Sequence, residues 1–109
     1  GCRFLIARPG ARPLTVEADV DSAPQAYARL DRQAVEYSQN VLWSHAGPGA
    51  YPRTVADLGV AADWFPADRR LLATDGTQLV EVVATWPGAR RGTEQALAEA
   101  TARSYLGHP

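Results

Sequence analysis

The sequence predicts a small α+β domain in which two helices pack on one face of an antiparallel four-stranded sheet. Three observations support this. The 109 residues suit one domain, and the apolar fraction of 46% can supply a core. Two pairs of strand-like runs are each followed by a helix-like segment, which gives the order strand-strand-helix-strand-strand-helix. We expect residues 1–109 to be the soluble part of a longer membrane-anchored or secreted chain.

The N-terminal segment is predicted to contribute two strands. Residues 3–7 form a short apolar run, and the Pro- and Gly-rich residues 8–13 predict a loop. From Leu14 to Val20 apolar and polar side chains alternate, which is typical of a strand with one buried and one solvated face. The two runs therefore predict a hairpin with a long loop.

A long helix is predicted over Ala23–Ala46, because its apolar side chains recur at steps of three and four. Ser22 and Gln25 have the spacing of a capping box, and Gly47-Pro48 should end the helix. After it we expect a rigid loop, one helical turn at Val55–Leu58 and an irregular stretch to Asp68.

The second hairpin is predicted over Leu71–Trp86, turning at Asp75-Gly76 with two turn residues. That register places Leu71 opposite Val80. The better core face then carries Leu71, Ala73, Val80, Val82, Ala84 and Trp86. A last helix is predicted over Glu94–Leu106, with Gly107 as its stop.

The charge and composition limit the functions that are open to this chain. The chain has 11 basic residues, all Arg, and 12 acidic ones. The resulting net charge of −1 predicts no nucleic-acid partner. The absence of Lys, with one Ile and one Asn, indicates a GC-rich bacterial genome. One cysteine excludes an internal disulfide and a multi-cysteine metal site. We expect no cofactor and no metal.

The first residues predict a processed chain. The sequence has no Met, and Gly1-Cys2 resembles the cleavage point of a bacterial lipoprotein signal. We therefore expect an extracytoplasmic domain that reaches the membrane only through a preceding anchor or a lipidated Cys2. The alternatives are that Cys2 is an ordinary thiol, and that the chain is a cytoplasmic fragment cut at a domain boundary.

No arrangement of residues predicts catalysis. Cys2, His45 and His108 have no nucleophile–base or metal-ligand spacing around them. Gly47-Pro48-Gly49 lacks the preceding strand and the Lys of a phosphate-binding loop. We therefore predict no catalytic residue.

Two groups of residues are candidate binding sites. Aromatic side chains precede proline in Tyr51-Pro52, Phe65-Pro66 and Trp86-Pro87, and Trp64 lies beside the second pair. They predict an aromatic groove for a peptide, glycan or lipid, or alternatively a second small core. In either arrangement we expect Trp86 to be buried and Trp64 to be partly exposed.

The second group is basic. Its members are Arg69, Arg70, Arg90 and Arg91, which lie near the same end of the predicted hairpin. They predict a small anion site, and the alternative is solvated surface.

One family resemblance concerns the segment after the long helix. Gly49-Ala50-Tyr51-Pro52-Arg53-Thr54, followed by Leu58, is similar to the helix-to-head transition of type IV pilins and pseudopilins. The resemblance implies an assembly subunit whose helix continues toward the membrane through the preceding residues. The strands predicted in residues 3–20 and the C-terminal helix depart from that pattern.

The sequence thus favours a non-enzymatic extracytoplasmic binding or assembly domain, with its ligand and oligomeric state left open. A pilin-like assembly subunit is one alternative. A small enzyme or an enzyme's accessory domain is the other.

Overall fold

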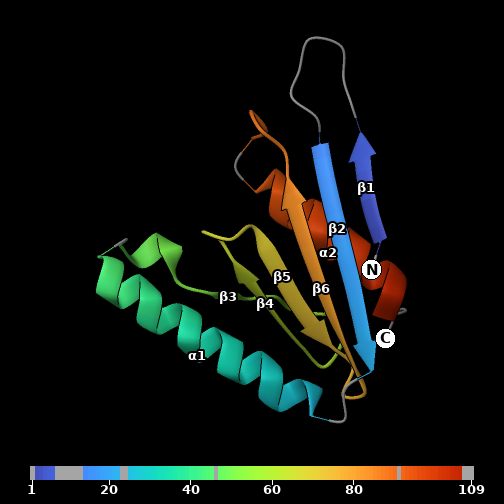
Figure 1. Ribbon diagram of the computed structural model, residues 1–109, viewed down its shortest axis with the longest axis horizontal. Helices are drawn as coiled ribbons and strands as arrows, with labels where there is room; N and C mark the ends of the chain where they lie inside the picture. The colour runs from blue at the N-terminus through green and yellow to red at the C-terminus, as the bar shows by residue number, and fades with distance from the viewer. Residues whose placement is uncertain (1, 7–13, 23–24, 46, 91, 107–109) are drawn as a thin grey trace.

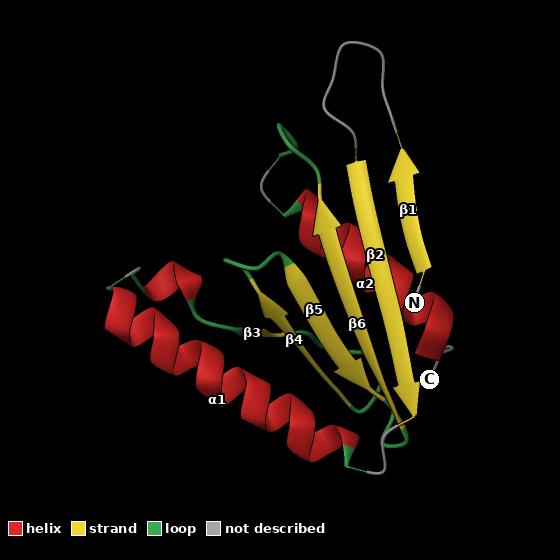
Figure 2. Ribbon diagram, viewed as in Figure 1, coloured by secondary structure: helices red, strands yellow, loops and turns green. Residues whose placement is uncertain are grey.

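The computed structural model describes residues 2–6, 14–22, 25–45, 47–90 and 92–106, and it confirms the α+β class with two helices and an antiparallel sheet (Figures 1 and 2). The elements follow the order β1 (Cys2–Ile6), β2 (Leu14–Ser22), α1 (Ala26–Ser44), η1 (Pro48–Ala50), β3 (Arg53–Thr54), β4 (Ala61–Phe65), β5 (Arg70–Thr74), β6 (Gln78–Thr85) and α2 (Thr93–Leu106).

The sheet is larger than the predicted four strands. Its order is β1-β2-β6-β5-β4-β3, and β3 is a two-residue strand at one edge. The additional strands form in the stretch that was expected to hold a helical turn and irregular chain. Strand β4 shows no alternation of apolar and polar residues because both of its faces are covered: Trp64 is buried on one face and Phe65 on the other.

The prediction that both helices pack on one face is wrong, because they cover opposite faces of the sheet. Leu71 and Ala73 of β5 belong to the core under α2, whereas Leu72 packs with Leu30 and Tyr37 of α1. Residues 71–74 are all buried, so this central strand has two core faces. The chain therefore forms three layers, with the sheet between α1 and α2. Figure 1 shows α2 passing behind β6 and β2.

The hairpin of β5 and β6 is confirmed, but its register differs by two residues from the predicted one. Leu71 lies opposite Val82, and Thr74 lies opposite Leu79. The turn is longer because Asp75 organises it: its Oδ1 accepts hydrogen bonds from the backbone N–H groups of Thr77 and Gln78, both at 2.9 Å. A shift of two preserves the faces. The predicted core face is accordingly buried from Leu71 to Ala84, with Trp86 half-buried beyond it.

Gly76 provides a test of this turn, because its φ is +101° and only glycine adopts that conformation without strain. Replacing Gly76 by Val should lower the free energy of unfolding by about 1 kcal/mol or more. A Cβ at this position meets nothing within 4 Å, so the loss would come from the backbone alone. Urea denaturation measures it, and a Val variant as stable as the wild type would contradict the observed turn.

The predicted long helix is confirmed over Ala26–Ser44, and its apolar stripe buries Leu30, Tyr37 and Val41. Residues 23, 24 and 46 lie outside the described part of the chain. The capping box does not form: Ser22 ends β2, and Gln25 precedes the helix without a side-chain capping bond. His45, rather than Gly47, takes the left-handed position that ends the helix.

The pilin resemblance implies a helix through the residues before α1, but Leu14–Ser22 forms strand β2. This part of the implied fold is therefore not present. Among the described residues, no helix combines the length and apolar character that would let it cross a membrane.

Candidate binding groove

The structure does not bring the predicted aromatic residues together in one groove. Trp64 is only 5% exposed and lies in the core under α2, so the prediction of its partial exposure is wrong. Phe65 is 0% exposed and packs on the opposite face, against Tyr37 of α1. Trp86 is half-buried at the end of the α2 core. Only Tyr51 remains on the surface.

Of the arginines predicted to form an anion site, the described ones do not all line one cleft. Arg70 reaches Glu81 at 3.4 Å and Asp68 at 3.7 Å, and its guanidinium lies 5.0 Å from the centre of the Phe65 ring. Arg69 approaches Glu94 at 3.4 Å. Arg90 lines a separate cleft near the start of α2. Arg91 lies outside the described residues.

A groove runs instead along the flank of α1, between this helix and the chain around β3. We call it the α1–β3 groove; its cavity volume is about 540 Å³, and it is lined by Ala34, Val35, Ser38, Gln39, Leu42, Tyr51, Pro52, Thr54 and Asp63. Apolar atoms dominate its wall. Because Val35 is 50% and Leu42 64% exposed, these side chains lie outside the core and remain available for contact.

Small side chains on α1 leave room for the groove. Ala34 lies on the helix between the buried Leu30 and Tyr37, and Ser38 follows one turn later. The Ser38 hydroxyl donates to the Ala34 carbonyl at 2.8 Å, which keeps its polar group against the helix. A longer side chain at either position would extend into the space that the groove occupies.

The helix that forms one wall is held firmly on the sheet. The Tyr37 ring meets the Phe65 ring edge-on, with 4.9 Å between ring centres. Its hydroxyl accepts a hydrogen bond from the Ala67 backbone N–H at 2.8 Å. These contacts fix α1 against β4, so we expect the groove to be largely formed before any ligand arrives.

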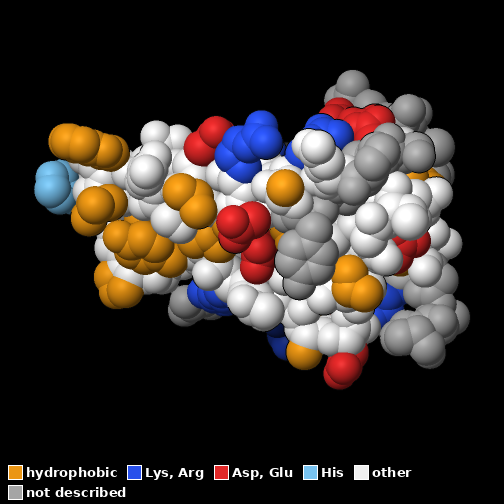
Figure 3. Space-filling model, turned by 90° about the horizontal axis from the view of Figure 1, so that it is seen from below, with side chains coloured by type: hydrophobic (Ala, Val, Ile, Leu, Met, Phe, Trp, Pro, Cys, Tyr) orange, Lys and Arg blue, Asp and Glu red, His pale blue; other side chains and the backbone are white. Residues whose placement is uncertain are grey.

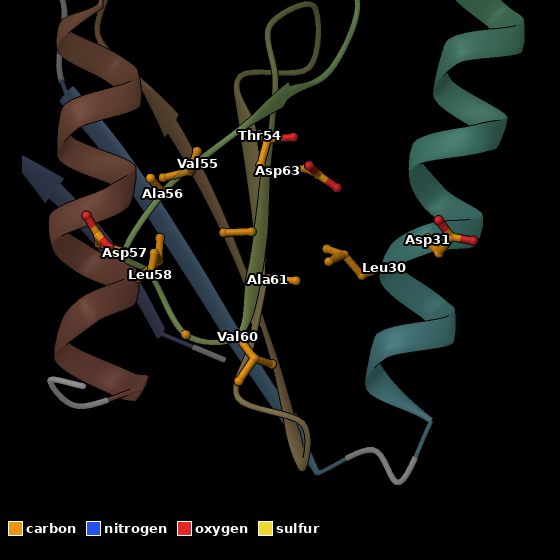
Figure 4. A pocket seen from close by; sticks show the side chains of 12 residues that line it. Leu30, Asp31, Thr54, Val55, Ala56, Asp57, Leu58, Val60, Ala61 and Asp63 are labelled. Atoms are coloured by element: carbon orange, nitrogen blue, oxygen red, sulfur yellow. The ribbon is translucent and has the colours of Figure 1, made fainter.

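One end of the groove is acidic. A second hollow of about 380 Å³ adjoins it, and Thr54 and Asp63 line both. This hollow also carries Asp31 from α1, and Asp63 extends from β4 toward the side on which Asp31 lies (Figure 4). Asp57, from the loop after β3, lines the hollow too but lies on the side of α2. Within the described residues, no salt bridge neutralises Asp31 or Asp63. We call these two carboxylates the acidic end.

The pKa of the Asp63 carboxyl group departs from its ordinary value. Its partial burial raises the pKa, and the nearby charge of Asp31 raises it further. A raised pKa means that the folded protein holds the Asp63 proton more tightly than the unfolded chain does. The carboxylate form is therefore disfavoured here until a cation compensates for the lost water and the neighbouring negative charge.

Apolar side chains gather at one end of the molecule, over the C-terminal half of α1 (Figure 3, left). The exposed large apolar residues on this helix are Val35, Leu42 and Trp43. Val35, Leu42 and the carboxylates of the acidic end are not among the candidate residues predicted from the sequence. A signal was present, since Val35 and Leu42 lie seven residues apart and beside, rather than within, the core stripe. Their pairing with Tyr51 depends on tertiary structure and could not be predicted from spacing.

The described residues contain no group of three or more His, Cys, Asp and Glu side chains that could hold a metal ion. In comparisons with known proteins, no family model, no curated protein and no solved structure matches this chain.

Proposed function

We propose that this chain is a non-enzymatic binding domain whose α1–β3 groove receives a short peptide segment of a partner protein. The observation that carries the proposal is the position of Val35, Leu42 and Tyr51, which are exposed apolar residues lining one groove. Isolated apolar residues on a surface are ordinary, but apolar residues gathered in a groove and rimmed by polar groups mark a binding site.

The charges around the groove indicate the chemistry of the peptide. The apolar wall suits a large aliphatic or aromatic side chain. The acidic end, with Asp31 and Asp63, suits a basic residue of the same segment. A guanidinium or ammonium group there would supply the positive charge that the carboxylates lack within the described chain. The proposed occupant is therefore a segment with one large apolar and one basic side chain.

We further propose that the domain acts outside the cytoplasm of a GC-rich bacterium; the absence of Lys, with one Ile and one Asn, supports the GC-rich genome. Binding a partner's segment is compatible with the assembly role that the sequence also favours. Protease treatment of intact producing cells tests the location: digestion of this domain without lysis supports it, and protection until lysis contradicts it.

A selection from a phage-displayed library of random peptides tests the binding proposal. We expect the wild-type chain to enrich peptides that combine a large apolar residue with Arg or Lys. The variants Val35→Glu and Leu42→Glu should each weaken the binding of a selected peptide by about tenfold or more, since each places a charge in the apolar wall. Isothermal titration calorimetry measures the loss.

The matched control is Asn40→Glu, which adds the same charge to an exposed position of α1 outside the groove lining. It should bind the peptide as the wild type does. The melting temperatures of all three variants should stay close to the wild-type value, because the replaced side chains are exposed. Failure of the library to enrich any peptide, or equal loss in the control, would overturn the proposal.

A further inference from the structure

A third hollow lies on the opposite face of the sheet from the α1–β3 groove. We call it the β3–α2 cleft; its volume is about 250 Å³. Arg53 and Arg90 line it, with Trp64 and Pro66 from the β4 region and Gln95 from the first turn of α2. The cleft thus joins three segments that are distant in sequence, and each arginine comes from a different one.

The register of β3 explains why this short strand serves two sites. Arg53 lies opposite Trp64, and Thr54 lies opposite Asp63. Successive side chains of a strand point to opposite faces. Arg53 and Trp64 therefore lie on the sheet face that α2 covers. Thr54 and Asp63 lie on the face that α1 covers, and Thr54 lines the α1–β3 groove.

The two arginines of the cleft differ from Arg69 and Arg70 in whether their charges are paired. Arg69 and Arg70 lie within salt-bridge distance of carboxylates. The Arg90 carbonyl accepts a hydrogen bond from the Thr93 N–H at 3.0 Å, but the guanidinium groups of Arg53 and Arg90 form no salt bridge or hydrogen bond in the part of the chain that the structure describes. Two exposed guanidinium groups therefore face one small cleft without a counter-charge of their own.

The one carboxylate that lines the cleft, Glu94, is already engaged. Its Oε2 accepts a hydrogen bond from the Trp86 backbone N–H at 2.6 Å, and its Oε1 lies 3.4 Å from Nε of Arg69. Arg69 has a left-handed φ of +51°, which is costly for a residue with a Cβ. Its backbone N–H donates to the Pro66 carbonyl at 3.3 Å, and its carbonyl accepts from the Ala84 N–H at 3.1 Å. These bonds hold the turn that brings Arg69 to Glu94, so the Glu94 charge is largely balanced.

We propose that the β3–α2 cleft binds a phosphoryl group between Arg53 and Arg90. A single guanidinium fork can satisfy a planar carboxylate, whereas a tetrahedral phosphate presents oxygens to donors on two sides. Two arginines on different segments therefore suit a dianion better than a carboxylate. The Gln95 side-chain amide, which also lines the cleft, donates one N–H to Glu99 at 3.0 Å and has a second N–H for a ligand. The ligand is either free phosphate or the phosphate ester of a small molecule.

An NMR titration of the ¹⁵N-labelled chain at constant ionic strength tests this inference. The probes are inorganic phosphate, glycerol 3-phosphate and acetate. We expect saturable shifts of the Gly92 and Gln95 amide signals with one or both phosphates, and weaker binding of acetate. Tighter binding of inorganic phosphate would assign the free ion, and tighter binding of glycerol 3-phosphate would assign the ester.

Variants assign the effect to the cleft. Arg53→Ala and Arg90→Ala should each weaken phosphate binding by about tenfold, because each removes one of two charged donors. The matched control is Arg32→Ala, which removes the same charge from an exposed position of α1 and should bind as the wild type does. Arg53→Lys keeps the charge but loses the fork, so its binding should be intermediate.

Shifts that do not saturate, equal loss in Arg32→Ala, or tighter binding of acetate than of both phosphates would overturn the inference. The outcome is independent of the peptide site. Val35→Glu and Leu42→Glu should leave phosphate binding unchanged, and Arg53→Ala should leave peptide binding unchanged.

Discussion

Replacing Trp64 by Ala should lower the free energy of unfolding by about 3–5 kcal/mol. The indole lies in the core under α2, together with Val55, Leu58 and Leu71. Its removal would leave a cavity among side chains that come from β5 and from the loop after β3. A domain of this size has a total stability of about 5–15 kcal/mol, so the loss would be a large share of it.

Trp43→Ala is the matched control, because Trp43 is 81% exposed and makes no part of either core. Its effect on the free energy of unfolding should stay within about 0.5 kcal/mol. Denaturation in urea, followed by far-UV circular dichroism, measures both variants. A Trp64→Ala variant as stable as Trp43→Ala would contradict the burial of Trp64 in the core under α2.

Replacing Gly59 by Ala should cost about 3 kcal/mol or more, for two separate reasons. The φ of Gly59 is +59°, which disfavours any residue with a Cβ. In addition, an added Cβ would collide with the backbone carbonyl oxygen of Thr74, which also accepts the Val60 N–H at 2.8 Å. The chain would have to break this hydrogen bond to make room.

Substitutions at two other glycines measure the cost of the backbone conformation separately from the cost of the steric clash. Gly88 has a φ of +80° but nothing within 4 Å of a Cβ, so Gly88→Ala should show the backbone cost alone, about 1 kcal/mol. Gly49 has open space and no positive φ, so Gly49→Ala should be close to neutral in the free energy of unfolding. If Gly59→Ala lowers the free energy of unfolding no more than Gly88→Ala does, Gly59 does not lie close to the Thr74 carbonyl.

The periodicity of apolar side chains predicted the helices and strands that bury only one face. The alternation of Leu14–Val20 and the stripe of Leu30, Tyr37 and Val41 were sufficient for β2 and α1, because each has one apolar face. The core face of the second hairpin was predicted as well. Its register was not, since the hydrogen bonds of Asp75 extend the turn beyond the two residues that Asp-Gly favours.

Strand β4 and the arrangement of the helices could not be predicted in the same way. In Ala61–Phe65 the side chains on both faces are apolar apart from Asp63, so no period of two is visible. Because β4 was not predicted, the second core was not predicted either, and both helices were assigned to one face of the sheet. Phe65 and Leu72 show the error, because they pack under α1 while their neighbours Trp64 and Leu71 pack under α2.

The candidate sites are formed by residues that lie close together in space but far apart in the sequence. The predicted aromatic pairs are mostly core residues, and among them Tyr51 alone lines the α1–β3 groove. Arg90 was predicted as part of an anion site, but its partner in the cleft is Arg53, which lies 37 positions earlier. Only the pairing of β3 with β4 brings Arg53 to this face.

The most direct test of the central claim is an NMR titration of the ¹⁵N-labelled chain with a library-selected peptide. The account predicts amide shifts at Val35, Ser38 and Leu42 on α1 and at Thr54 on β3. It also predicts that replacing the basic residue of the peptide by Ala removes the shifts at Asp31 and Asp63 while those at Leu42 persist. Shifts confined to β1, β2 or the β3–α2 cleft would show that the α1–β3 groove is not the binding surface.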